Sequence, residues 1–170
     1  MFNKLELVEK LIHSKHMPLR HDQQRHAGTR IVSEVVQTVR RNLSGLAYTS
    51  KRKALLDDFA REFPQALEAA GLSIEQVEEI YVVGSYVSDK PNPNDLDLIV
   101  YVPTAKFTVE LQGNQYEAYA NLNAWSQWEG HKTPITFDTD REHMLELLDM
   151  YSSGATRRLE GYRGPLRIYP

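Results

Sequence analysis

Two aspartates one residue apart, Asp95 and Asp97, introduce the longest wholly apolar run of this 170-residue chain. Successive side chains of a strand point to opposite faces, so both carboxylates share one face while Leu96 and Leu98 share the other. Neighbouring carboxylates repel each other and resist simultaneous ionisation unless a cation lies between them. A hard, oxygen-preferring ion such as Mg²⁺ meets that need. The pair therefore predicts a strand with one core face and one metal-binding face.

A second predicted strand ends in a small-residue turn shortly before the acid pair. Residues 80–83 read Ile-Tyr-Val-Val, a β-branched and aromatic run that is followed by Gly84 and Ser85. Glycine lets the backbone approach a ligand closely, and a serine hydroxyl with neighbouring N–H groups can bind phosphate oxygens. We therefore expect this turn to bind phosphates beside the metal.

Residues 80–102, which contain Gly84, Ser85, Asp95 and Asp97 in this order, resemble the signature of the DNA polymerase β-like nucleotidyltransferase superfamily, especially its minimal bacterial or phage members. The resemblance implies an α/β (α+β) nucleotidyltransferase fold with a small mixed twisted sheet, flanking helices and a helical N-terminal extension. It implies that Asp95 and Asp97 bind Mg²⁺ or Mn²⁺. It also implies that Gly84 and Ser85 bind the terminal phosphates of an NTP.

Superfamily members carry a third acid on a later strand, which completes the catalytic metal site. The candidate is Asp138, because it ends a predicted strand over residues 133–138 on that strand's polar face. Asp140 shares this parity and is the first alternative, although it also fits the N-terminus of the helix that follows. Glu110, in a predicted strand over residues 107–111, is the second alternative.

Lys90 is the remaining candidate for nucleotide binding. Many small superfamily members place an arginine after the glycine-serine pair to hold the triphosphate, and this chain has Lys90 there instead. Lysine neutralises phosphate as a point charge but lacks the planar fork of arginine. The alternative is an ordinary solvated loop lysine.

The resemblance implies an enzyme, a nucleotidyltransferase that moves a nucleoside monophosphate from an NTP to a hydroxyl. The acceptor would be an RNA 3′ end such as that of tRNA, a protein side chain or a small molecule. Stand-alone minimal members are often components of toxin–antitoxin or phage-defence systems, so a cognate antitoxin or toxin is a candidate partner. One alternative function is a catalytically inactive binding or regulatory module on the same fold.

A second alternative rests on the histidine-rich segment that precedes the predicted core. Arg20 and His26 have a spacing similar to the short arginine–histidine motif of the nucleotide-binding ribonucleases of higher eukaryotes and prokaryotes, which cut RNA without a metal. A solvated basic arm that lies over the active site is the simpler interpretation of this segment.

The composition excludes several classes of site and indicates a compartment. The chain has no cysteine, so disulfides, thiolate metal sites and cysteine nucleophiles are impossible. The N-terminus lacks the apolar stretch of a signal peptide, and the longest apolar run, residues 98–102, is far too short to span a membrane. We therefore expect a cytoplasmic protein without a membrane partner.

Charge is distributed unevenly along the chain. Residues 10–53 contain ten Lys and Arg against two acids, whereas residues 54–100 contain two Lys and Arg against ten acids. A basic segment beside a polyphosphate site would guide an RNA acceptor by contacts with its phosphates. Alternatively, the two segments pair with each other across the fold.

We expect a single nucleotidyltransferase-like domain over residues 1–170: a mainly helical part (1–72), a catalytic core (73–150) and a C-terminal extension (151–170). Helical periodicity is visible in the apolar stripes Leu5, Val8, Leu11, Ile12 and Ile31, Val35, Val36, Val39, Leu43. A third helix begins near residues 49–50, and Pro64 is expected to bend or split it. A capping box at Ser73 opens a short helix, and further helices are predicted at residues 116–128 and 142–150. The predicted strands are 80–83, 95–102, 107–111 and 133–138.

Overall fold

The computed structural model describes residues 21–103, 132–154 and 158–170, with side chains from residue 31 onward. The predicted elements at residues 107–111 and 116–128, and Glu110, lie outside the described residues. The described elements are, in chain order, α2 (His21–Leu43), η1 (Ser44–Leu46), α3 (Ser50–Ala69), η2 (Ile74–Gln76), β1 (Glu79–Val83), η3 (Gly84–Val87), β2 (Asp97–Tyr101), β3 (Ile135–Asp138), α5 (Arg141–Ser153) and β4 (Leu166–Tyr169).

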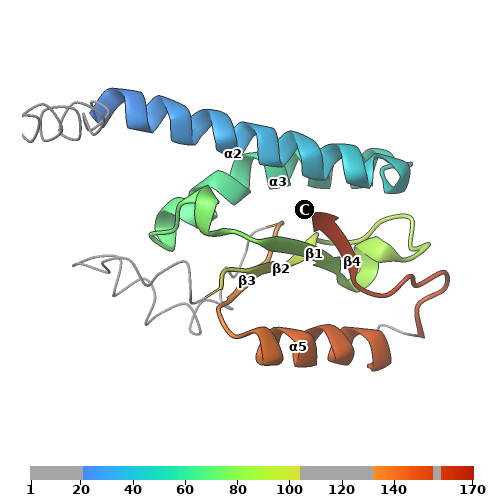
Figure 1. Ribbon diagram of the computed structural model, residues 1–170. Helices are drawn as coiled ribbons and strands as arrows, with labels where there is room; N and C mark the ends of the chain where they lie inside the picture. Colours follow the sequence, from blue (N-terminus) through green and yellow to red (C-terminus); the bar gives the residue numbers. More distant parts are fainter. Residues whose placement is uncertain (1–20, 104–131, 155–157) are drawn as a thin grey trace, which may run out of the picture.

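The four strands form one mixed sheet with the order β3-β2-β1-β4. β1 pairs antiparallel with both β2 and β4, whereas β2 pairs parallel with β3. Helices α2 and α3 cover one face of the sheet and α5 covers the other, which gives three layers (Figure 1). The prediction of an α+β protein with a small mixed sheet flanked by helices is thus confirmed. No helix in the described part of the chain is long and apolar enough to cross a membrane.

Alternation along β2 builds a core on each side of the sheet. Leu98 and Val100 belong to the larger cluster, which they share with the apolar faces of α2 and α3. Ile99 and Tyr101 point to the opposite face and pack with Met144 of α5. Asp97 has the parity of Ile99, so its carboxylate lies on the α5 side of the sheet.

Helix α3 forms because a good N-terminal cap precedes a buried apolar stripe. The Thr49 hydroxyl accepts a hydrogen bond from the Arg52 backbone N–H, as expected for an N-cap. Phe59 and Phe63 are fully buried, with ring centroids 5.3 Å apart. The helix is continuous past Pro64, so the predicted split does not occur there. Burial of the flanking apolar residues outweighs the one backbone hydrogen bond that proline cannot make.

The last strand, β4, was not predicted from the sequence. It lies beside β1 at the edge of the sheet, and the Asn42 side chain of α2 donates a hydrogen bond to the Ile168 carbonyl oxygen at 2.8 Å. Ile168 is the one buried residue among its four positions. Such a short strand with a single buried side chain leaves little periodicity to detect.

Candidate metal centre

The pairing of β1 with β2 places the glycine turn against the acid pair. Val83, the last residue of β1, is the partner of Asp97, so Gly84 follows directly at the end of β2 that carries the acids. Gly84 has φ +73°, a left-handed conformation, and a Cβ built there would lie 2.6 Å from Asp97 Oδ2. Only glycine fits both the conformation and the close approach. The turn and the acid pair therefore come together as the sequence predicts.

Asp97 and Asp95 form a coupled pair of carboxylates. Burial, the charge of Asp95 and a hydrogen bond with that side chain together raise the pKa of Asp97 to about 7, and burial is the largest of the three causes. Near neutral pH the pair therefore retains a proton that an isolated aspartate would have lost. A cation between the two carboxylates would replace this proton, which is the electrostatic condition for a metal site.

Tyr151 of α5 lies close to the acid pair from the helix side. Burial raises the pKa of its phenol, and the charges of Asp97, Tyr162 and Asp95 add to the increase in that order. The Tyr162 hydroxyl donates a hydrogen bond to the Tyr151 carbonyl oxygen at 2.7 Å. This bond connects α5 to residues 158–164, the C-terminal turn, which precede β4. The carboxylates therefore face a tyrosine of the layer that covers them.

Arg52 of α3 holds the segment that follows the glycine turn. The side chain is fully buried, and its guanidinium donates hydrogen bonds of 2.6–3.2 Å to four carbonyl oxygens, those of Leu46, Tyr86, Ser88 and Lys90. It also lies over the rings of Tyr48 and Tyr86, 4.6 and 4.8 Å from their centroids. Arg52 is a functional residue that was not predicted from the sequence, although its position gives a signal: it precedes Leu55 and Phe59 at helical spacing on the buried face of α3.

The C-terminal turn fastens the same segment from its other side. The Asp89 N–H donates to the Glu160 carbonyl oxygen and the Arg163 N–H donates to that of Val87, both at 2.9 Å. The Arg163 guanidinium also pairs with the Asp89 carboxylate at 3.0 Å. The phosphate-binding candidate segment is therefore held between α3 and a part of the chain about 70 residues later.

The structure does not bring Asp138 together with the acid pair. Asp138 is the β3 partner of Tyr101, four residues beyond Asp97 on β2, so it lies about 13 Å further along the strands. Its buried carboxylate accepts the Asp140 N–H at 2.9 Å and contacts His143 Nδ1 at 2.6 Å. Asp138 thus orders the start of α5, and the expectation that it completes the metal site is corrected by the register.

Of the two alternatives for the third acid, Glu110 lies outside the described residues and Asp140 has another role in the structure. Asp140 is the N-cap of α5, and its side chain accepts hydrogen bonds from the N–H groups of Glu142 and His143. It therefore fills the capping role that the sequence also allowed. The β3 residue beside Ile99, on the face of Asp97, is Thr136. Among the side chains that the structure describes, those of residues 31–103, 132–154 and 158–170, no group of three or more acids or histidines is arranged to hold a metal ion.

The remaining candidates lie in or near the turn. Ser85 is half-buried in η3, and its carbonyl oxygen accepts the Ser88 hydroxyl hydrogen at 2.6 Å. Lys90 is exposed, and its backbone N–H donates to the Ser88 Oγ at 3.2 Å. Phosphate binding by these two residues stays a prediction. Arg20 and the side chain of His26, on which the ribonuclease alternative rests, lie outside the described part.

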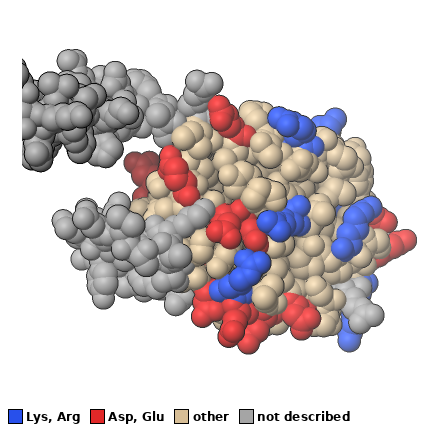
Figure 2. All heavy atoms as spheres, viewed as in Figure 1, with Lys and Arg blue, Asp and Glu red and all other residues tan. Residues whose placement is uncertain are grey.

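The basic and acidic segments pair with each other in part. Arg40 of α2 and Asp57 of α3 form an ion pair at 2.8 Å that joins them. On the face that Figure 2 shows, acidic and basic side chains are interspersed. RNA guidance by the basic segment stays a prediction.

Fold and site together define an α+β protein whose described residues form a mixed sheet of four strands, with a paired-carboxylate site at the end of the central β1–β2 pair. A family described as "Family of unknown function (DUF6932)" matches residues 31–168, which extend from the middle of α2 to the third residue of β4. The chain belongs to this family. No curated protein and no solved structure matches the chain.

The close contact between Gly84 and Asp97 predicts that two glycine substitutions lower the free energy of unfolding by different amounts. Gly84→Ala and Gly164→Ala both force alanine to a left-handed φ, +73° and +76°, but only position 84 has an atom within 4 Å of the new Cβ. We expect Gly164→Ala to lower the free energy of unfolding by about 1 kcal/mol and Gly84→Ala to lower it by about 1–3 kcal/mol more. Urea denaturation measures both, and equal losses would contradict the contact.

The raised pKa of Asp97 predicts that removing its charge increases the stability of the folded protein, and that this increase depends on pH. The folded state holds this proton up to about pH 7 and the unfolded state loses it near pH 4, so metal-free stability falls as pH rises between these values. Asp97→Asn should therefore be more stable than wild type at pH 8, by up to about 4 kcal/mol in the free energy of unfolding for a shift of this size, and should gain nothing at pH 4. Mg²⁺ should stabilise only the wild type at pH 8.

Thermal melting of both proteins across this pH range checks the expectation, with Asp149→Asn on the exposed side of α5 as the matched control. An Asp97→Asn protein that is less stable than wild type at pH 8 without metal would count against the coupled pair.

Proposed function

We propose that this chain binds a nucleoside triphosphate with Mg²⁺ at Asp95 and Asp97 and transfers its nucleoside monophosphate to a hydroxyl acceptor. The acceptor oxygen loses its proton and bonds to the α-phosphorus, the α–β phosphoanhydride bond breaks, and pyrophosphate leaves. The observation that carries the proposal is the contact of the Gly84 turn with a carboxylate pair that retains a proton near neutral pH. A polyphosphate bound on the turn would lie within reach of a cation on the carboxylates. The resemblance of residues 80–102 to the nucleotidyltransferase signature adds support.

The residues present suit Mg²⁺ in number and kind. Mg²⁺ commonly binds proteins through one or two carboxylates, and substrate phosphates and water complete its octahedron. The ion would neutralise phosphate charge and polarise the attacked phosphorus. Asp95 and Asp97 would hold the ion, while Gly84 and Ser85 would orient the terminal phosphates. Lys90 is the proposed additional contact with the triphosphate.

A second candidate function is a non-catalytic module that binds a nucleotide for regulation. The observation that favours it is Thr136, which occupies the β3 position next to Ile99 on the face of the acids. With Asp138 turned to His143 and the start of α5, no third acid joins the pair in the described part of the chain. Such a module would bind Mg²⁺ and NTP and leave the nucleotide intact.

The acceptor and biological role are proposed on the resemblance alone. An RNA 3′ end such as that of tRNA and a protein side chain are the proposed acceptors. A cognate toxin or antitoxin is the proposed partner in a toxin–antitoxin or phage-defence system.

A labelling experiment tests the proposed activity. The protein is incubated with each α-³²P-labelled NTP, Mg²⁺, total tRNA and cell extract, and label on RNA and on protein is counted separately. We expect one acceptor class to be labelled, and the label to fall at least about a hundredfold in Asp97→Asn because two-carboxylate metal binding is lost. Asp138→Asn should keep the transfer within about threefold, since its carboxylate lies about 13 Å along the strands from the pair.

Calorimetric titration of wild type with Mg²⁺ and each NTP separates the two candidates. Binding that needs Asp97, without transfer to any acceptor, would favour the regulatory module. Full-rate transfer by the Asp97→Asn protein would overturn the assignment of the site, provided that circular dichroism shows all variants folded.

A further inference from the structure

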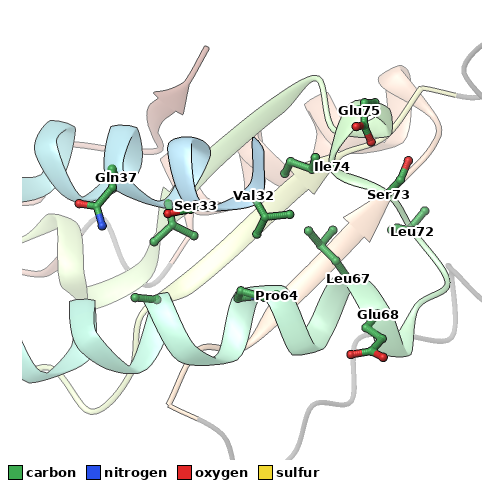
Figure 3. Close-up of a pocket in the computed structure, with 12 residues that line it drawn as sticks. Val32, Ser33, Gln37, Pro64, Leu67, Glu68, Leu72, Ser73, Ile74 and Glu75 are labelled. Atoms are coloured by element: carbon green, nitrogen blue, oxygen red, sulfur yellow. The ribbon is translucent and has the colours of Figure 1, made fainter. Parts of the chain in front are cut away.

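A groove lies between α2 and α3 (Figure 3). These two helices cover the face of the sheet that is opposite α5 (Figure 1). The groove has a volume of about 850 Å³, and it is closed at one end by the turn before η2. Its apolar lining comes from both helices and this turn: Val32, Ala60, Pro64, Leu67, Leu72 and Ile74. Ser33 and Gln37 on α2 and Glu68 on α3 form its polar rim. A volume of this size accommodates several large side chains.

Buried residues of the larger core cluster line the groove, but some apolar side chains on both helices remain partly exposed to solvent. Val36, Leu67 and Ile74 are buried members of the larger core cluster, whereas Val32 and Ala60 are only partly buried. Ile31, which precedes Val32, keeps 37% of its surface exposed. Apolar surface that is contiguous with a core and open to solvent commonly marks a docking site.

The sequence that precedes α2 contains an apolar segment of matching character. Leu5, Val8, Leu11 and Ile12 have helical spacing, and their segment precedes α2. The groove begins at Val32, 11 residues into α2, or about 16 Å from its first residue. The eight connecting residues 13–20 can extend over about 26 Å, so the apolar stripe can reach the groove along α2.

We propose that the α2–α3 groove is the docking site of residues 5–12 of the same chain, which lay their apolar stripe between the two helices. A tethered segment is present at millimolar effective concentration, so it occupies the groove ahead of a free partner or a second copy. The inference is independent of the nucleotide site, because the groove and the acid pair lie on opposite faces of the sheet. Docking would direct the histidine-rich connector along α2, away from Asp97.

Cysteine cross-linking tests the docking, because the chain has no native cysteine. In the full-length protein, Val8→Cys is combined in turn with Ser33→Cys on α2 and Glu68→Cys on α3, the two walls of the groove. The matched control combines Val8→Cys with Met150→Cys, which is 64% exposed on α5 at the other face of the sheet. Disulfide formation at low oxidant is followed by non-reducing electrophoresis.

The expected result is an intramolecular disulfide in at least one groove pair, formed at least about tenfold faster than in the control because of the higher local concentration. Adding Leu5→Asp with Leu11→Asp should return that rate to the control value, since charged residues do not enter an apolar groove. Equal rates in groove and control pairs would overturn the proposal. Cross-linked dimers in place of the intramolecular product would assign the groove to a second copy and would equally overturn it.

Discussion

The antiparallel pairing of β1 with β2 is the constraint on which the rest of this structure depends. The partnership of Val83 with Asp97 sets Gly84 against the carboxylate, and the glycine is tolerated there because it has no Cβ. A shift of the register by one residue would turn Asp97 into the core and an apolar side chain toward α5. The two core clusters on β2, one under α2 and α3 and the other under α5, fix this register.

Around this hairpin, interactions between distant parts of the chain hold the segment after Gly84 in place. The buried guanidinium of Arg52 satisfies four carbonyl oxygens, and the Asp89–Arg163 ion pair and two backbone hydrogen bonds attach the C-terminal turn. Removing one partner from such a buried network leaves polar groups unsatisfied. The turn that contacts Asp97 is thus fixed in place, and the neighbouring carboxylates of Asp95 and Asp97 beside it form an arrangement that favours a divalent cation.

Local sequence signals predicted the elements that carry their own pattern. The strand ending at Gly84, the capping box at Ser73 and the helix after Asp140 agree with the structure. The strand predicted over residues 95–102 is present as Asp97–Tyr101, so Asp95 lies just before it and not within it. What the sequence could not supply was register between distant strands. Asp138 has the correct parity, yet parallel pairing places it beside Tyr101 instead of Asp97. Arg52 was missed for a related reason, because three of its four partner carbonyl oxygens belong to residues more than 30 positions away.

Anomalous diffraction from crystals grown with Mn²⁺ and a non-hydrolysable NTP tests the central claim most directly. Mn²⁺ prefers the oxygen ligands that suit Mg²⁺ and gives a signal that can be located in the map. The account predicts a peak about 2.0–2.2 Å from a carboxylate oxygen of both Asp95 and Asp97, with the phosphates against the Gly84 turn. A map with no peak between these side chains, or with Mn²⁺ only at a different site, would contradict it.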